Sequence, residues 1–104
     1  MKDMTFKQLE TAVLAWADER GLLDDFNPNA QAAKMIEEAS EILMGMAHNN
    51  YDEIVDGIGD TVVTLILLAH MYGATTTACL QAAYDEIKDR KGKTVNGQFI
   101  KEEA

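Results

Sequence analysis

Two acidic stretches decide the fold of this chain, Lys34-Met-Ile-Glu-Glu-Ala-Ser-Glu41 and Glu53-Ile-Val-Asp-Gly-Ile-Gly-Asp60. Each lies within a pattern of apolar residues that repeats with the 3.6-residue period of an α-helix. The segment His48-Asn49-Asn50 supplies a short turn between them. Because a short turn brings consecutive helices side by side, we expect an antiparallel helix pair with the two acidic stretches facing each other.

Carboxylates recur on one stripe of each predicted helix. The first stripe contains Lys34, Glu38, Glu41 and Gly45, with Glu37 close beside it, and the second contains Glu53, Asp56, Asp60 and Thr64. Five or six carboxylates gathered between two helices would repel one another by several kcal/mol unless a positive charge lay between them. Oxygen ligands suit a hard cation, so the pattern predicts a site for Mg²⁺, with Mn²⁺ as a substitute.

Length and charge limit the class of protein. We expect residues 1–104 to form a single domain. The net charge of −9 disfavours nucleic acid and anionic membranes as partners, although a bound cation could still receive a small anionic substrate. A lone cysteine, Cys79, fits a reducing compartment, and the N-terminal residues lack the apolar core of a signal peptide. We therefore expect a cytoplasmic protein, in the host cytoplasm if a phage encodes it.

The apolar periodicity predicts an all-α fold, an antiparallel bundle of about four helices followed by a short tail or hairpin. The Thr5-x-x-Gln8 capping box opens the first helix, and Asn27-Pro28 opens the second. An Asn-Gly pair near the C-terminus is the turn signal of a β-hairpin. The expected helices span about residues 5–20, 28–47, 52–72 and 75–90, and the tail spans 91–104.

The third helix predicts an oligomer. Its segment Thr61–Ala69 is apolar on nearly every side, which is typical of a helix that is central or buried against another subunit. We therefore expect a homo-oligomer, either a dimer or a tetramer. Gly57 and Gly59 each cost this helix about 1 kcal/mol relative to alanine, which indicates close approach by a neighbouring helix or a ligand. Trp16 is expected to anchor the core, in preference to serving as a platform for base stacking.

Other interpretations of the acidic residues are less favoured. Exposed helices usually mix charges of both signs, whereas few basic residues accompany these carboxylates, so two solvated faces explain the pattern less well. A di-iron centre requires Glu-x-x-His pairs, and neither His48 nor His70 has a glutamate three residues before it. One cysteine and two distant histidines also disfavour zinc.

A basic cluster follows the fourth predicted helix, and two interpretations of it remain open. Cations near a helix C-terminus interact favourably with the helix dipole. The same side chains could instead bind substrate phosphates, together with Lys34 from the acidic stretch. The residues of this cluster are Lys88, Arg90, Lys91 and Lys93.

These features together resemble the MazG-like nucleoside triphosphate pyrophosphohydrolases. The resemblance is carried by Lys34-x-x-Glu-Glu-x-x-Glu41, by Asp56-Gly-Ile-Gly-Asp60 with the apolar run after it, and by the segment from Ile87 to Phe99, which looks like small forms found in bacteriophages. It covers about residues 9–100. It implies an oligomeric all-α enzyme that uses Mg²⁺ to hydrolyse a nucleoside or deoxynucleoside triphosphate to the monophosphate and pyrophosphate.

The resemblance also implies roles for individual residues. Glu38 and Glu41 match the first acidic pair of the family, and Asp60 matches the aspartate before the apolar run, so these three are expected metal ligands. Glu37, Glu38 and Glu41 form the expected catalytic set, with Glu37 or Glu41 activating a water. Gly57 stands where the family has a further acid; we expect Asp56 to replace it, with Glu53 as the alternative.

A function of a different class also fits the sequence. The chain could be a non-catalytic helical module that oligomerises or binds a metal or a nucleotide, with a subunit interface on the third helix. Turnover of a nucleotide separates the two hypotheses.

Overall fold

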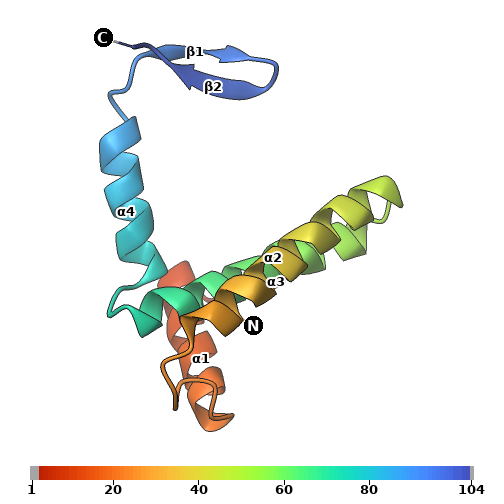
Figure 1. The fold of residues 1–104 in the computed structure, drawn as a ribbon, viewed down its shortest axis with the longest axis vertical. Coiled ribbons are helices and arrows are strands. Elements are labelled where there is room, and N and C mark those ends of the chain that lie inside the picture. Colours follow the sequence, from red (N-terminus) through yellow and green to blue (C-terminus); the bar gives the residue numbers. More distant parts are fainter. Residues whose placement is uncertain (1–2, 104) are drawn as a thin grey trace.

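The computed structural model describes residues 3–103, and in this range the chain is mostly helical (Figure 1). The four predicted helices are present as α1 (Phe6–Glu19), α2 (Pro28–Ala47), α3 (Tyr51–Met71) and α4 (Thr76–Ile87). The predicted Asn-Gly hairpin is also present, as β1 (Gly92–Val95) and β2 (Gln98–Lys101). The fourth helix ends at Ile87, three residues earlier than predicted, because the following residues lead into β1.

Side-chain caps fix where the helices begin. Thr5 and Gln8 form the predicted capping box: the Gln8 amide donates to Thr5 Oγ1 at 3.2 Å, and the Thr5 amide donates to Gln8 Oε1 at 2.8 Å. Asn27, Asn50 and Thr75 cap α2, α3 and α4, because each side chain accepts a bond from the amide three residues later. The element boundaries therefore follow directly from local sequence.

Two glycines allow α2 and α3 to pack closely side by side. A Cβ atom at Gly57 would lie 2.8 Å from Ile42 Cγ1, and one at Gly45 would lie 3.0 Å from Ile54 Cγ1. At Gly59, apart from the adjoining backbone of α3 itself and the two neighbouring residues, no atom of residues 3–103 lies within 4 Å of that position. The expected close approach is thus confirmed at Gly57, where a neighbouring helix requires it, and is not found at Gly59.

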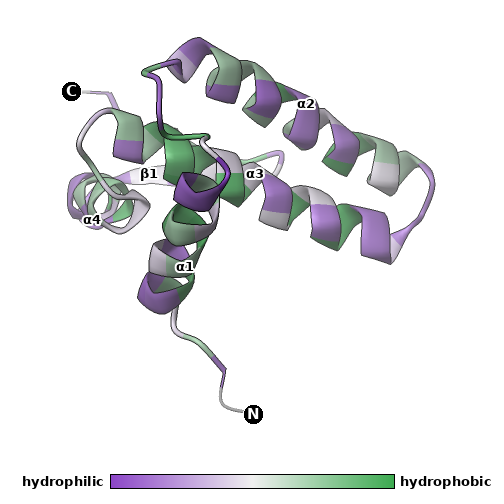
Figure 2. Cartoon of the chain, turned by 90° about the horizontal axis from the view of Figure 1, so that it is seen from below, coloured by the Kyte–Doolittle hydropathy of each residue, from purple (hydrophilic) through white to green (hydrophobic). Residues whose placement is uncertain are grey.

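A small core lies where α1 crosses the second half of α3, the most hydrophobic part of the chain (Figure 2). Ala17, Ile66 and Leu67 are buried there, with partly buried apolar side chains around them. Trp16 is 44% exposed, so the expectation that it anchors the core is wrong. Its neighbour Ala17 faces α3 instead, since adjacent helical residues point about 100° apart.

The last helix leaves the body of the molecule, and the hairpin lies at its far end (Figure 1). Glu10, buried on α1, holds the beginning of α4: its carboxylate accepts bonds from the Thr76 hydroxyl and, at 3.1 Å, from the Thr77 amide. No residue of α4 is buried. Within residues 3–103, the helices therefore form a tight α2–α3 pair with α1 across one end, and α4 does not join them in a closed bundle.

Asn96 and Gly97 make the turn of the hairpin with φ of 51° and 80°, the left-handed values of a type I′ turn. The strands pair antiparallel, with Gly92 opposite Lys101 and Val95 opposite Gln98. Every residue of both strands is exposed. The hairpin thus has the predicted turn but covers no core of its own.

One helix in the described range, α3, is long and apolar enough to cross a membrane by length and composition alone. Only 22% of its most apolar window is buried within the chain. The core helix of a soluble protein passes the same test, so this observation is weak support for a membrane span.

Candidate active site

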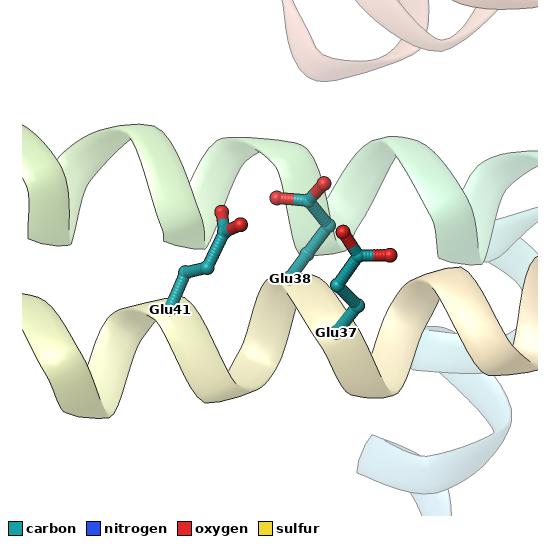
Figure 3. Close-up of side chains that lie close together, drawn as sticks. All are labelled: Glu37, Glu38 and Glu41. Carbon is teal, nitrogen blue, oxygen red and sulfur yellow. The ribbon is translucent and has the colours of Figure 1, made fainter.

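Three glutamates of α2 meet beside α3 (Figure 3). Glu37, Glu38 and Glu41 each place a carboxylate oxygen within 4.8 Å of the others. They converge because residues three and four apart share one face of a helix, and this face is directed toward α3, as the buried Gly45 one turn further on shows. The structure therefore brings together the three residues predicted as the catalytic set.

Glu38 is the buried member of this cluster. The residue is 8% exposed, and its Oε2 atom has no hydrogen-bond partner among residues 3–103. Lys34 reaches the other side of the carboxylate, with Nζ 3.3 Å from Glu38 Oε1 and 3.5 Å from Glu37 Oε1. A buried carboxylate oxygen without a partner is costly, so this atom has a free position for a cation.

Charge accumulates in the cluster beyond what Lys34 balances. Hydrogen bonding between the Glu41 and Glu38 carboxyls, together with the negative charge of Glu38, raises the pKa of Glu41. Hydrogen bonding to Glu38 and the charges of Glu37 and Glu38 raise the pKa of Lys34, which therefore stays cationic. A divalent cation would relieve the remaining repulsion, and an all-carboxylate donor set suits Mg²⁺ or Mn²⁺.

A cavity of about 460 Å³ opens between α1, α2 and α3 beside this cluster. Its polar wall contains Lys34, Glu38 and Asp60. The other walls are mostly apolar and include Trp16, Leu22, Ala30, Val63 and Leu67. A concave site with an apolar lining and a few convergent charged groups is the usual form of a small-molecule pocket.

Trp16 lies in the candidate site, whereas its place on an apolar stripe predicted a role in the core in preference to base stacking. It lines this cavity and also a neighbouring one of about 330 Å³, which likewise includes Asp60. The Arg20 guanidinium lies 4.7 Å from the centre of the Trp16 ring, a cation–π contact that fixes one face of the indole. The Trp16-x-x-x-Arg20 spacing, one helical turn, was the available signal in the sequence.

The acids of α3 are distributed differently from those of α2. Asp60 lines the cavity with Glu38 and Lys34. Asp56 is exposed and lies outside both the cluster and this cavity. Glu53 is half-buried near the turn, where Oε2 lies 3.2 Å from His48 Nδ1. The structure thus places neither proposed replacement for the missing acid beside Glu38.

The same geometry explains why position 57 carries no acid. The space beyond the Gly57 Cα is filled by Ile42, whose backbone nitrogen would lie 3.2 Å from an added Cβ. A glutamate there would force α2 and α3 apart, because it would point at the backbone of α2 and not into the cavity.

The basic cluster lies far from the acidic cluster of the same chain (Figure 1). Lys88 and Arg90 pair with carboxylates of α4 itself, at 3.7 Å to Asp85 and 2.8 Å to Glu86. Lys91 directly precedes β1 and Lys93 lies in it, and both line a shallow recess of about 400 Å³. Of the predicted phosphate-binding residues, the structure therefore brings only Lys34 to the acids.

Comparison with known proteins finds a relative of uncharacterised function. The chain is 40% identical over 63 residues to an uncharacterised 18.2 kDa protein from the rep–hol intergenic region of Haemophilus phage HP1. The match covers 61% of this chain and 39% of the phage protein, so it spans less than half of that relative's length. No family model and no solved structure matches the chain. The match links the sequence to a phage protein.

Proposed function

We propose that this protein is a Mg²⁺-dependent hydrolase that cleaves a nucleoside or deoxynucleoside triphosphate to the monophosphate and pyrophosphate. The observation that carries the proposal is the cluster of Glu37, Glu38 and Glu41 with the unpartnered Glu38 Oε2 beside a cavity that contains Lys34 and Trp16. The resemblance to MazG-like enzymes is consistent with it. The activity would take place in the cytoplasm, that of the host if a phage encodes the chain.

Each side chain of the cavity fits a part of this reaction. Glu38, Glu41 and Asp60 would hold the cation, which neutralises phosphate charge when bound. Lys34 now pairs with Glu37 and Glu38 and would turn to a phosphate oxygen once a cation replaced it. Glu37, the exposed member, would then orient a water and accept its proton as that water attacks a phosphorus of the α–β phosphoanhydride. The α–β bond breaks in the same step, so that the monophosphate and pyrophosphate separate.

The apolar part of the cavity suits the nucleobase. Trp16 offers a flat indole surface on which any base can stack, and Leu22 and Leu67 line the same space. Stacking alone discriminates weakly among bases, so we expect turnover of more than one nucleotide.

A panel of NTPs and dNTPs tests this proposal, with the monophosphate and pyrophosphate measured as separate products. Glu38→Gln should abolish turnover and retain the helical circular dichroism. Glu19→Gln, at an exposed glutamate of α1 outside the cluster, is the matched control and should retain turnover. Equal activity of the Glu38→Gln and Glu19→Gln enzymes would rule out the assigned site.

A second candidate is a non-catalytic interaction module, and the exposed apolar surface favours it. Leu43, Tyr72 and Leu80 are each 67–68% exposed, although apolar residues of this size usually lie inside a protein. Metal binding and self-association without turnover of any nucleotide in the panel would support this function instead.

A further inference from the structure

The single chain exposes far more surface than a folded monomer of its size. Its accessible area is 8145 Å², whereas a monomer of 11.5 kDa is expected to expose roughly 5,800 Å². Its radius of gyration is 16.3 Å, against roughly 13 Å for a compact chain of this length. The excess of roughly 2,300 Å² is about what one chain buries in an obligate interface. An excess of this size indicates that the chain buries further surface against a second copy of itself.

No residue of α4 or of the hairpin strands is buried, and we call this segment, residues 76–101, the arm. Leu80, Tyr84 and Ile87 form a stripe along α4 and are more than half exposed. Phe99 of the hairpin is likewise 52% exposed. An isolated two-stranded hairpin is marginally stable in water, so the arm needs a surface to pack on.

The arm is fixed at its base in a direction that leads away from its own body (Figure 1). The Glu10 carboxylate binds the hydroxyl of Thr76 and both the hydroxyl and the amide of Thr77. Folding the arm back onto its own α2 would break these buried bonds and leave the Glu10 charge unpaired. The surface that covers the arm is therefore expected on another molecule.

Charge indicates where on that molecule the arm docks. Between Lys88 and Lys101 the chain has five basic residues and one acidic residue, a net charge of +4. The α2–α3 segment, 28–71, has seven acidic residues and one lysine, a net charge of −6. Lys91 and Lys93 have no ion-pair partner within residues 3–103 of their own chain. Opposite potentials of this kind fix the register of an interface.

We propose that the arm docks on a second copy of this chain and places Lys91 and Lys93 beside the Glu37–Glu38–Glu41 cluster of that copy. The acidic site of one chain is then completed by the hairpin of another. This inference rests in part on the proposed function, because there the two lysines would bind the phosphates of the substrate. The docking itself requires no catalysis.

The test uses zero-length carbodiimide cross-linking, which joins a lysine amine to a carboxylate in direct contact. Equal amounts of ¹⁴N- and ¹⁵N-labelled full-length protein are unfolded together, refolded and cross-linked. We expect links from Lys91 or Lys93 to Glu37 or Glu41, with about half of them joining a light to a heavy peptide, as random exchange within a symmetric assembly requires. The Lys88–Asp85 link, within one chain, is the internal control and stays isotopically pure.

Sedimentation of variants is the second part of the test. The wild-type protein should sediment at twice 11.5 kDa or more at micromolar concentration. Tyr84→Asp with Ile87→Asp should yield monomers, and Lys91→Glu with Lys93→Glu should weaken association at least tenfold. Lys7→Glu, an exposed lysine of α1 outside the arm, should have no such effect.

Several outcomes overturn the inference. These are a wild-type monomer, isotopically pure links from Lys91 and Lys93, an assembly in which these lysines link elsewhere, or an unassociated chain that binds lipid vesicles through α3. Inter-chain links without nucleotide turnover would instead leave the docking intact and refute the proposed function. Turnover without inter-chain links would refute the docking alone.

Discussion

Glu38 combines three properties that rarely occur together at one residue: burial, an ion pair with Lys34 and an oxygen without a partner. The sequence predicted its place on the acidic stripe, because helical periodicity fixes which residues share a face. The depth of its burial could not be predicted, since that depends on how closely Gly45 and Gly57 allow α3 to approach. The chemistry of the site follows from that tertiary contact.

Asp60 and Asp56 provide a matched test of which α3 carboxylate belongs to the site. Asp60 lines the cavity with Glu38, whereas Asp56 lies outside it. We therefore expect Asp60→Asn to lower Mn²⁺ affinity and Asp56→Asn to have the smaller effect, although the sequence predicted both aspartates as metal ligands. Isothermal titration calorimetry measures both. A larger loss of affinity in Asp56→Asn would show that α3 is rotated relative to α2 in the metal-bound state.

Glu10 should make the stability of the protein depend on pH. The hydrogen bond from Thr76 lowers the pKa of Glu10 below its ordinary value of 4.5. The stabilisation is therefore present above pH 4.5 and is lost as the pH falls through the lowered pKa of the folded state. Bonds of this kind contribute roughly 1–3 kcal/mol.

Thermal unfolding of Glu10→Gln and wild-type protein between pH 7 and pH 3 measures this contribution. The variant should be less stable at pH 7, and the two proteins should converge as the pH falls. A constant difference between them at every pH would contradict the role assigned to the carboxylate charge.

The sequence predicted the positions of the helices and of the hairpin better than any other feature of the structure. Caps such as Thr5 and Asn27 and the Asn96-Gly97 turn are local signals, and each produced the predicted element. The direction of α4 could not be predicted, because it depends on a bond between Glu10 and residues more than sixty positions away. The expectation for Trp16 was wrong for a similar reason. Trp16 lies on an apolar stripe of α1, but the residue of α1 that is buried against α3 is Ala17.

Gly57 and Gly59 test the packing of the α2–α3 pair directly. A Cβ at Gly57 would press on Ile42, so Gly57→Ala should destabilise the protein by roughly 1–3 kcal/mol, despite the better helix propensity of alanine. At Gly59 the space is open, so Gly59→Ala should stabilise it by up to about 1 kcal/mol. Urea unfolding measures both changes. If the two variants shifted stability in the same direction, the close approach at Gly57 would not be the cause.

At the scale of the whole molecule, the chain has a small core and an uneven distribution of charge. Residues 88–101 carry a net positive charge, and residues 28–71 carry a net negative charge. The described chain buries three apolar residues and exposes most of its large ones. The sequence predicted an oligomer from the apolar third helix, and that prediction remains to be tested. The structure adds a physical reason for it: the arm has no buried residue, and its net positive charge is opposite to that of the α2–α3 pair.

Cation binding at the α2 cluster is the central requirement of the proposed site. Calorimetric titration with Mn²⁺, in the absence of nucleotide, compares the wild-type protein with Glu38→Gln and with Glu19→Gln as the control. We predict binding to the wild-type and the control, and affinity lower by at least about tenfold in Glu38→Gln, because the buried carboxylate oxygen is the ligand with no other partner. Equal Mn²⁺ affinity in all three proteins, or no binding to any of them, would contradict a cation site at Glu38.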